Sequence, residues 1–417
     1  MSRLTRLALP GVLWLALVGV SPAATMGQPG SPGQWGPPGP PPVPGQPVPP
    51  LLPPGPTANP RVLTRAWTVP GAAVGSPAAD DATAYFLSKY HELVAVDAAS
   101  GQVRWRQPTN ESGFGGTGGT VVVAGSVVVV GDDNVLGFNR LTGALRWRFQ
   151  PSEGYGPGFY LGYQATADGV IYAGSPSGRL YAVDTLTGRP RWTTVVAGDG
   201  KTTVYPPRFS GAYVAAGYTE FVAPSLGGIV MLDAATGRIV WKRAFPTPRD
   251  RSLSVSWAGG PVFVDDLVIV SAGDGIIHAY DVASGNERWS IPPVTVLPGN
   301  LIDPARDFRG LAVSGRTLIS GSLTGEIAAY DLDSREERWR YSAGRLGSVI
   351  FRIEAIGDVV YIPFAGGTLV ALQASDGAEL WRVGDWTASI LWPPVLWGDL
   401  VIVSGAVDGY SAFHAAR

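Results

Sequence analysis

One nine-residue pattern occurs seven times along the chain, and this repetition limits the possible folds more than any other feature. Each copy ends in Trp, eight residues after its first residue, and successive Trp residues are separated by 42, 45, 49, 48, 50 and 42 positions. A period of this size, built from short strand-like runs, is typical of solenoids and propellers. The copies are Asp97–Trp105, Asn139–Trp147, Asp184–Trp192, Asp233–Trp241, Asp281–Trp289, Asp331–Trp339 and Gln373–Trp381.

The fifth repeat shows what one unit contains. Its strand-like runs are Pro261–Val264, Leu267–Ser271, Ile276–Asp281 and Glu287–Ile291, separated by Asp-Asp, Gly-Asp-Gly and Ser-Gly. Such runs predict a four-stranded antiparallel meander, with strands A to D from the inside outward. The recurring D-x-x-T/S-G lies between strands C and D, where the Asp carboxylate can hold the turn and Gly can adopt positive φ. The sixth copy has Arg335 in place of Gly, which predicts a different or strained turn.

An eighth repeat is split between the two ends of the chain. His414 occupies the turn-Asp position and no strand D follows it, whereas Leu63–Gly71 resembles a strand D with no strands A to C before it. We therefore expect an all-β fold, an eight-bladed β-propeller of four-stranded antiparallel blades closed by pairing the N-terminal strand with the C-terminal blade; seven blades are the alternative. Each structural Trp is expected to pack against the neighbouring blade with its indole N–H bonded. These residues are Trp67, Trp105, Trp147, Trp192, Trp241, Trp289, Trp339 and Trp381.

The first 60 residues differ from the repeats. Residues 1–24 predict a signal peptide, because Arg3 and Arg6 precede the apolar run Leu7–Val20 and small residues follow. The run is shorter than the roughly 20 residues that span a bilayer, and an uncleaved interfacial anchor is the alternative. Residues 25–60 are rich in Pro and Gly and predict a disordered tether, with a collagen-like trimer as a second interpretation. We expect an exported protein of the periplasm, cell envelope or extracellular space, with no transmembrane span after cleavage and residues 61–417 forming the propeller.

Composition excludes several classes of function. The net charge is −2 and only 15% of residues are charged, so no basic stripe indicates nucleic-acid binding. The chain has no Cys and three His, which leaves no disulfide, no c-type haem attachment and few ligands for a transition metal. We expect His278 to pack within strand C. The adjacent carboxylates Asp80-Asp81, Asp132-Asp133 and Asp265-Asp266 are candidates for acid–base chemistry. Asp265-Asp266 is expected to form an A–B turn, and Asp132-Asp133 a B–C turn, with a cation site at Asp132-Asp133-Asn134 as the alternative.

The repeat is similar to the PQQ-like repeat, A-x-D-x-x-T/S-G-x-x-x-W, which appears here as AVDAASGQVRW, AVDTLTGRPRW and AYDVASGNERW. This family of the quinoprotein alcohol dehydrogenase-like superfamily contains dehydrogenases that bind pyrroloquinoline quinone (PQQ) and Ca²⁺. It also contains the non-catalytic outer-membrane-assembly factor BamB, which docks on the barrel-assembly machinery through loops on one face. The chain looks like the second kind, because it lacks the vicinal Cys pair that many of the dehydrogenases carry. It also lacks the lipobox Cys of BamB.

The resemblance implies an exported, non-catalytic β-propeller that acts as a protein-binding scaffold in outer-membrane or envelope protein assembly. It implies a monomer without a cofactor, whose partner is another envelope protein, with a barrel-assembly component as the candidate. Two alternatives remain open: a PQQ- and Ca²⁺-dependent quinoprotein dehydrogenase-like enzyme (an oxidoreductase), and a module that binds an envelope polymer such as a carbohydrate.

The candidate partner-binding residues lie in long connections on the face opposite the D-x-x-T-G turns, where the D-to-A and B-to-C loops meet. Loops on a rigid scaffold often carry function, and Arg with aromatic residues is the usual composition of interface hot spots. The alternative is that the charges form a self-paired rim and the aromatic residues pack beneath the loops. No catalytic, cofactor-binding or metal-binding residue is assigned. The candidates are Arg249, Asp250, Arg251, Asp303, Arg306, Asp307, Arg309, Tyr155, Phe159, Tyr160, Trp386, Trp392 and Trp397.

Overall fold

The structure, a computed structural model of the chain, describes most of residues 61–415. Residues 1–60 and 416–417 lie outside the described residues, and with them the predicted signal peptide and tether. For residues 61–62, 160, 226, 296–297, 301–302 and 308–309 only the backbone is described. The other segments that are not described are 72–74, 89, 110–119, 132, 152–159, 162–165, 198–201, 221–225, 246–259, 273–274, 293–295, 298–300, 303–307, 323–324, 343–352, 365–366, 385–391 and 406–408.

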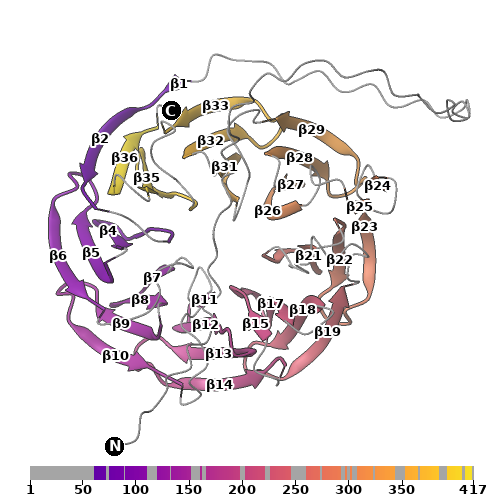
Figure 1. Ribbon diagram of the computed structural model, residues 1–417, viewed down its shortest axis with the longest axis horizontal. Coiled ribbons are helices and arrows are strands. Elements are labelled where there is room, and N and C mark those ends of the chain that lie inside the picture. The colour runs from indigo at the N-terminus through magenta and orange to yellow at the C-terminus, as the bar shows by residue number, and fades with distance from the viewer. Residues whose placement is uncertain are drawn as a thin grey trace, which may run out of the picture. The chain divides into compact units, whose positions relative to one another are not determined.

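Eight sheets, each with a four-stranded antiparallel meander at its centre, surround a common axis (Figure 1). Within each sheet the strands follow one another from the axis to the perimeter, as the Val-, Ile- and Tyr-rich runs and their Asp- and Gly-containing turns predict. The prediction of an all-β, eight-bladed propeller is confirmed. Among the described residues there is no helix long and apolar enough to cross a membrane.

The strands of blades 1 to 4 share this meander order. They are, in blade 1, β3 (Ala78–Ala79), β4 (Thr83–Leu87), β5 (Glu92–Asp97) and β6 (Val103–Pro108); in blade 2, β7 (Val121–Ala124), β8 (Val127–Gly131), β9 (Val135–Asn139) and β10 (Leu145–Phe149); in blade 3, β11 (Tyr160–Leu161), β12 (Val170–Gly174), β13 (Arg179–Asp184) and β14 (Pro190–Val195); and in blade 4, β15 (Thr202–Val204), β16 (Arg208–Ser210), β17 (Tyr213–Glu220), β18 (Leu226–Asp233) and β19 (Ile239–Phe245). In blade 4, β15 and β16 both pair with β17 as two halves of strand A.

Blades 5 to 8 repeat the arrangement. They are built, in blade 5, from β20 (Val262–Val264), β21 (Leu267–Ser271), β22 (Ile277–Asp281) and β23 (Glu287–Ile291); in blade 6, from β26 (Phe308–Ser314), β27 (Thr317–Ser322), β28 (Glu326–Asp331) and β29 (Glu337–Ser342); in blade 7, from β30 (Glu354–Ile356), β31 (Val359–Phe364), β32 (Thr368–Gln373) and β33 (Glu379–Val383); and in blade 8, from β34 (Val395–Trp397), β35 (Leu400–Gly405) and β36 (Gly409–His414).

The two ends of the chain share blade 8. Strand β2 (Thr64–Val69) pairs antiparallel with β36 and so supplies the outer strand of this blade, with Thr64 opposite His414. Strand β1 (Arg61–Val62) pairs in parallel with β33, the outer strand of blade 7. The N-terminal residues thus join the outer strands of two neighbouring blades. The sequence predicts the antiparallel pairing, whereas the parallel pairing is an additional feature.

The hydrophobic core is divided into eight clusters, one at each contact between neighbouring blades. The cluster between blades 8 and 1 contains Trp67, Phe86 and Tyr410, and the rings of Phe86 and Tyr410 stack with centroids 3.7 Å apart. The alternating side chains of each strand point to the two faces of the blade, so every blade contributes to two clusters. Burial of these side chains is the main driving force that holds the blades together.

The predicted turn chemistry is present between strands C and D. Gly188 has φ of +70°, and a Cβ placed there would lie 2.5 Å from the ring of Trp147 in the preceding blade. The indole N–H of Trp147 donates to the carbonyl of Thr185, 3.0 Å away. Such an indole bond to the next blade is also made by Trp67, Trp192, Trp241 and Trp339.

Arg335 occupies the Gly position of the sixth copy. Its φ is +65°, and its backbone N–H donates to the carbonyl of Asp331 at 2.7 Å, as Gly188 does to Asp184 at 2.8 Å. The turn is therefore the same as in the other blades, with a side chain in a region of φ that costs about 1–2 kcal/mol. Of the two predicted outcomes, the strained turn is confirmed and the different turn is wrong.

Candidate functional site

The meander gives the propeller two unlike faces. Successive strands alternate in direction, so the A–B and C–D turns lie on one face, which we call the turn face. The B–C loops and the D-to-A connections between blades lie on the opposite face, which we call the loop face. By sequence position, all the predicted partner-binding residues except Trp397 belong to D-to-A connections or to the strand ends beside them. Trp397 is the last residue of strand A of blade 8 and pairs with Leu400 across the A–B turn, so it lies on the side of the turn face, and its predicted position on the loop face is wrong.

The structure describes only part of this predicted set. Arg309 lies in β26 and Tyr160 in β11, where the backbone alone is described, and Trp392 and Trp397 are described fully. The proposed role of the set therefore stays a prediction. The members outside the described residues are Arg249, Asp250, Arg251, Asp303, Arg306, Asp307, Tyr155, Phe159 and Trp386.

The two Arg-rich connections lead into and out of blade 5. The first joins β19 to β20, and the second joins β23 to β26. The second contains a hairpin that the sequence did not predict, in which β24 (Val296–Leu297) pairs with β25 (Leu301–Ile302). The strand ends that bound both connections thus lie on the loop face, and both connections adjoin blade 5.

Arg309 stands at an irregularity in its strand. Phe308 pairs with Ser322 and Gly310 pairs with Gly321, so Arg309 is an extra residue between two consecutive pairs. Such a β-bulge bends the strand and redirects a side chain, and bulges are over-represented beside functional sites. Of the predicted Arg residues, this one has a described backbone feature that sets it apart from the regular ladder.

Trp397, in contrast, takes part in packing. It is half-buried in β34 and lies against the core cluster between blades 8 and 1, together with Val395. Trp392 is also half-buried. At Trp397 the packing alternative of the sequence analysis therefore applies.

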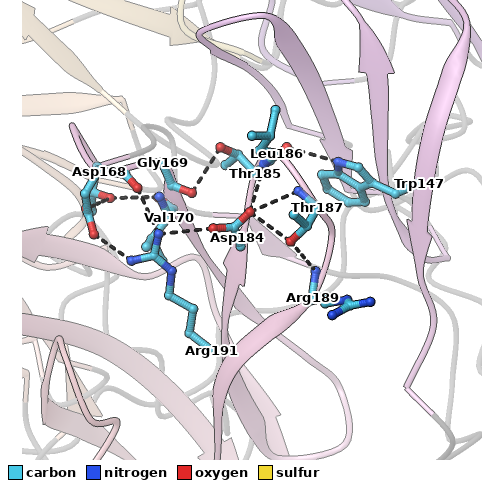
Figure 2. A network of polar contacts seen from close by, with 11 residues as sticks. Trp147, Asp168, Gly169, Val170, Asp184, Thr185, Leu186, Thr187, Arg189 and Arg191 are labelled. Atoms are coloured by element: carbon cyan, nitrogen blue, oxygen red, sulfur yellow. Dashed lines mark hydrogen bonds and ion pairs between the residues drawn. The ribbon is translucent and has the colours of Figure 1, made fainter.

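The turn face carries an extensive network of ion pairs (Figure 2). The carboxylate of Asp184 accepts hydrogen bonds from the backbone N–H of Thr187 at 3.0 Å and of Leu186 at 3.2 Å. Arg191 reaches Asp184 at 3.1 Å and Asp168 at 2.6 Å. One guanidinium thereby joins the A–B turn and the C–D turn of blade 3, while Trp147 of blade 2 lies against the same C–D turn.

The electrostatics of this network keep its carboxylates ionised. Burial raises the pKa of Asp184, but hydrogen bonds from Thr187 and Arg191 outweigh it and bring the pKa below its ordinary value. Hydrogen bonds from Thr166 and Arg191 lower the pKa of Asp168. In blade 1, hydrogen bonds from Arg104 and Ser100 lower the pKa of Asp97 to about 2. These groups serve as acceptors and are unsuited to act as general acids near neutral pH.

The same pairing recurs around the ring, and the sequence analysis missed it. The Arg immediately before the repeat Trp binds the turn Asp seven residues earlier. The spacing D-x₆-R-W is visible in the sequence and would have predicted the contact. The pairs are Arg104–Asp97, Arg191–Asp184, Arg288–Asp281 and Arg338–Asp331.

Two of the three adjacent carboxylate pairs that suggested acid–base chemistry are also used structurally, whereas Asp132 of the third pair lies outside the described residues. Asp265 adopts φ of +52° in the A–B turn of blade 5, and Arg316 of blade 6 binds its carboxylate at 2.7 Å. Asp80 accepts bonds from two backbone N–H groups and from Tyr85, and its pKa is lowered despite burial, which raises it. The prediction that Asp265-Asp266 forms a turn is confirmed.

Metal ligation finds no support in the described part of the chain, which contains no group of three or more His, Cys, Asp or Glu residues placed to hold an ion. His278 is buried, with its ring stacked at 5.4 Å from that of Phe245 and 5.8 Å from that of Tyr280. Its Nδ1 lies 3.1 Å from the carboxylate of Glu287. The predicted packing role of His278 is confirmed.

One ion pair connects blades that are not neighbours. Arg208 of β16 and Glu354 of β30 come from the inner strands of blades 4 and 7, and their charged groups are 3.7 Å apart. Both side chains are 24% exposed. Because strand A of each blade lies nearest the axis, this contact crosses the centre of the ring.

Fold, repeat and turn chemistry together define the class: an eight-bladed β-propeller of PQQ-like repeats with structural ion pairs on its turn face. The chain belongs to the family described as outer membrane protein assembly factor BamB, whose model matches residues 61–223, 206–307, 305–392 and 323–416. These matches together include nearly all of the propeller.

Individual relatives agree with this assignment. The chain is 26% identical to the outer membrane protein assembly factor BamB of Yersinia pestis over 248 residues, which cover 59% of this chain and 58% of that protein. The fold is similar to that of BamB from Moraxella catarrhalis (TM-score 0.61, 15% identity, 85% of this chain and 100% of that chain). It is also similar to quinohemoprotein alcohol dehydrogenase from Comamonas testosteroni (TM-score 0.64, 14% identity, 85% and 77%). At such identities the two structures show a shared fold alone.

Proposed function

We propose that this protein is an exported, non-catalytic scaffold that binds another protein of the cell envelope during outer-membrane protein assembly. Membership of the BamB family is the single observation that carries the proposal. The use of the turn-face carboxylates in structural ion pairs supports a binding role over an acid–base one. The predicted leader and tether support export, and we further propose that the protein needs no PQQ or Ca²⁺.

The binding surface in this proposal is the loop face at blade 5. Two connections with Arg residues flank this blade, and Arg309 stands at a β-bulge where the second connection enters blade 6. Arg is among the residues most enriched at the energetic centres of interfaces, because its planar group forms several directed bonds. A barrel-assembly component is the partner we favour.

The experiment is a pull-down of the tagged protein from the envelope fraction, with mass spectrometry of the proteins recovered. Reversal of charge at Arg249, Arg251, Arg306 and Arg309 to Glu should remove a specific envelope protein from the eluate. Arg238→Glu, on the turn face of blade 4, is the control and should leave recovery unchanged. If the fourfold variant recovers the same partners as the wild type, the proposed surface is wrong.

A further inference from the structure

Two neighbouring C–D turns on the turn face differ from all the others in their exposed third position. Leu141 of blade 2 is 76% exposed and Leu186 of blade 3 is 61% exposed, although Leu is usually buried. A third exposed Leu, Leu145, lies at the start of the outer strand of blade 2, and its side chain is 47% exposed. The third positions of the seven C–D turns are Ala99, Leu141, Leu186, Ala235, Ala283, Asp333 and Ser375.

The two Leu-bearing turns belong to adjoining blades. Trp147 of blade 2 donates to the carbonyl of Thr185, the residue before Leu186. Its ring also lies against Gly188 of the same turn. The apolar tips thus stand on one edge of the turn face as a pair, and each projects from a tight turn whose backbone is fixed by hydrogen bonds.

The C–D turns of blades 2 and 3, with the start of the strand that follows each, carry a net positive charge. Residues 139–148 and 184–193 contain five Arg and one Asp, whereas the equivalent segments of blades 6 and 7, residues 331–340 and 373–382, contain four Arg and six acidic residues. In blade 2 the turn Asp is replaced by Asn139, and Arg146 is exposed. Arg189, in blade 3, is exposed as well. Exposed aliphatic tips and excess positive charge therefore occur at the same place.

The acidic groups that face these turns are few. Asp168 and Asp184 both bind Arg191, and Asp80 of blade 1 lies 3.4 Å from Arg140. The A–B turn of blade 2 contributes Gly125 and Ser126, which carry no charge. The surface around Leu141 and Leu186 is thus positive on balance.

We propose that the C–D turns of blades 2 and 3 form a membrane-docking edge that inserts Leu141 and Leu186 among the headgroups of an anionic lipid bilayer. Apolar side chains flanked by Arg on one surface are the general signature of interfacial binding, in which apolar burial and attraction to anionic lipid add together. A protein partner fits less well, because interface centres favour aromatic residues and a standard interface uses about 20–30 residues on each side. This edge is on the face opposite the proposed protein-binding loops, so the scaffold would hold its partner while facing the membrane.

The absence of Cys allows a direct test. Leu141→Cys and Leu186→Cys would each carry a single polarity-sensitive fluorophore in the whole chain. Ala283→Cys, at the equivalent turn position of blade 5, and Tyr90→Cys, an exposed residue of the loop face, are the matched controls. The probes are vesicles of phosphatidylcholine alone and of two parts phosphatidylcholine to one part phosphatidylglycerol.

We expect anionic vesicles to shift the emission of the labels at 141 and 186 to the blue, with no shift at 283 or 90 and none with neutral vesicles. In flotation of unlabelled protein, the double variant Leu141→Asp/Leu186→Asp should bind vesicles at least about tenfold more weakly than the control variant Tyr90→Asp. No shift at 141 and 186, or an equal shift at all four positions, would overturn the proposal. A shift without vesicles that grows with protein concentration would assign these tips to a second copy of the chain and would overturn it too.

Discussion

The close contact between each turn Gly and the repeat Trp of the preceding blade can be tested by adding one methyl group at the Gly position. Gly188→Ala places a Cβ 2.5 Å from the ring of Trp147, at a φ of +70°. The positive φ alone costs about 1 kcal/mol for a non-Gly residue. Displacement of the indole also strains its bond to Thr185, worth about 1 kcal/mol, and loosens a large packed ring. We therefore expect Gly188→Ala to lower the free energy of unfolding by about 3 kcal/mol.

A matched control separates the two contributions. Gly211, in the A–B turn of blade 4, has φ of +54°, and a Cβ there meets no described atom within 4 Å. Gly211→Ala should therefore cost only the conformational part, about 1 kcal/mol. Urea titrations followed by circular dichroism, with the slope shared between variants, give both values. Equal destabilisation by the two substitutions would refute the idea that the Trp contact requires Gly.

Two further predictions concern the ion pairs. The pKa of Asp97 is about 2 in the folded protein, below the ordinary value of 3.8, so this group stabilises the fold above about pH 4 and the contribution is lost as the pH falls toward 2. Asp97→Asn should therefore reduce the difference in urea midpoint between pH 5 and pH 2.5, and an unchanged difference would contradict the assignment. A double-mutant cycle with Arg208→Ala and Glu354→Ala should give a coupling of about 0.5–1 kcal/mol, because both groups are partly exposed; additive effects would mean that the contact across the ring contributes nothing.

Local chemistry explains how much of the fold could be predicted. The number of blades, the turn Gly residues and the strained turn at Arg335 follow from the period and from the φ that each turn requires. The pairing of β2 with β36 follows from the two incomplete repeats at the ends. Each of these inferences depends either on residues near one another in sequence or on the number and spacing of the repeats.

Features that join distant segments were missed. The parallel pairing of β1 with β33 involves two residues without a repeat signature. The contact of Arg208 with Glu354 depends on the positions of two inner strands along the propeller axis. The repeat period does not determine those positions. The loop-face candidates rest on composition, and most of them lie in connections whose lengths and sequences differ from blade to blade, so no repeat rule positions their side chains. The Arg–Asp pairs were within reach, because their spacing is regular.

Site-specific photo-crosslinking in the cell tests the scaffold function most directly. A photoreactive residue replaces Pro292, which is exposed on the loop face where β23 ends. This substitution leaves all the candidate Arg residues unchanged. The same residue at Asn286, exposed on the turn face of the same blade, is the control. We predict that position 292 captures a specific envelope protein and position 286 does not. Capture of the same proteins at both positions, or of none at position 292, would contradict the account of the loop face as the partner-binding surface.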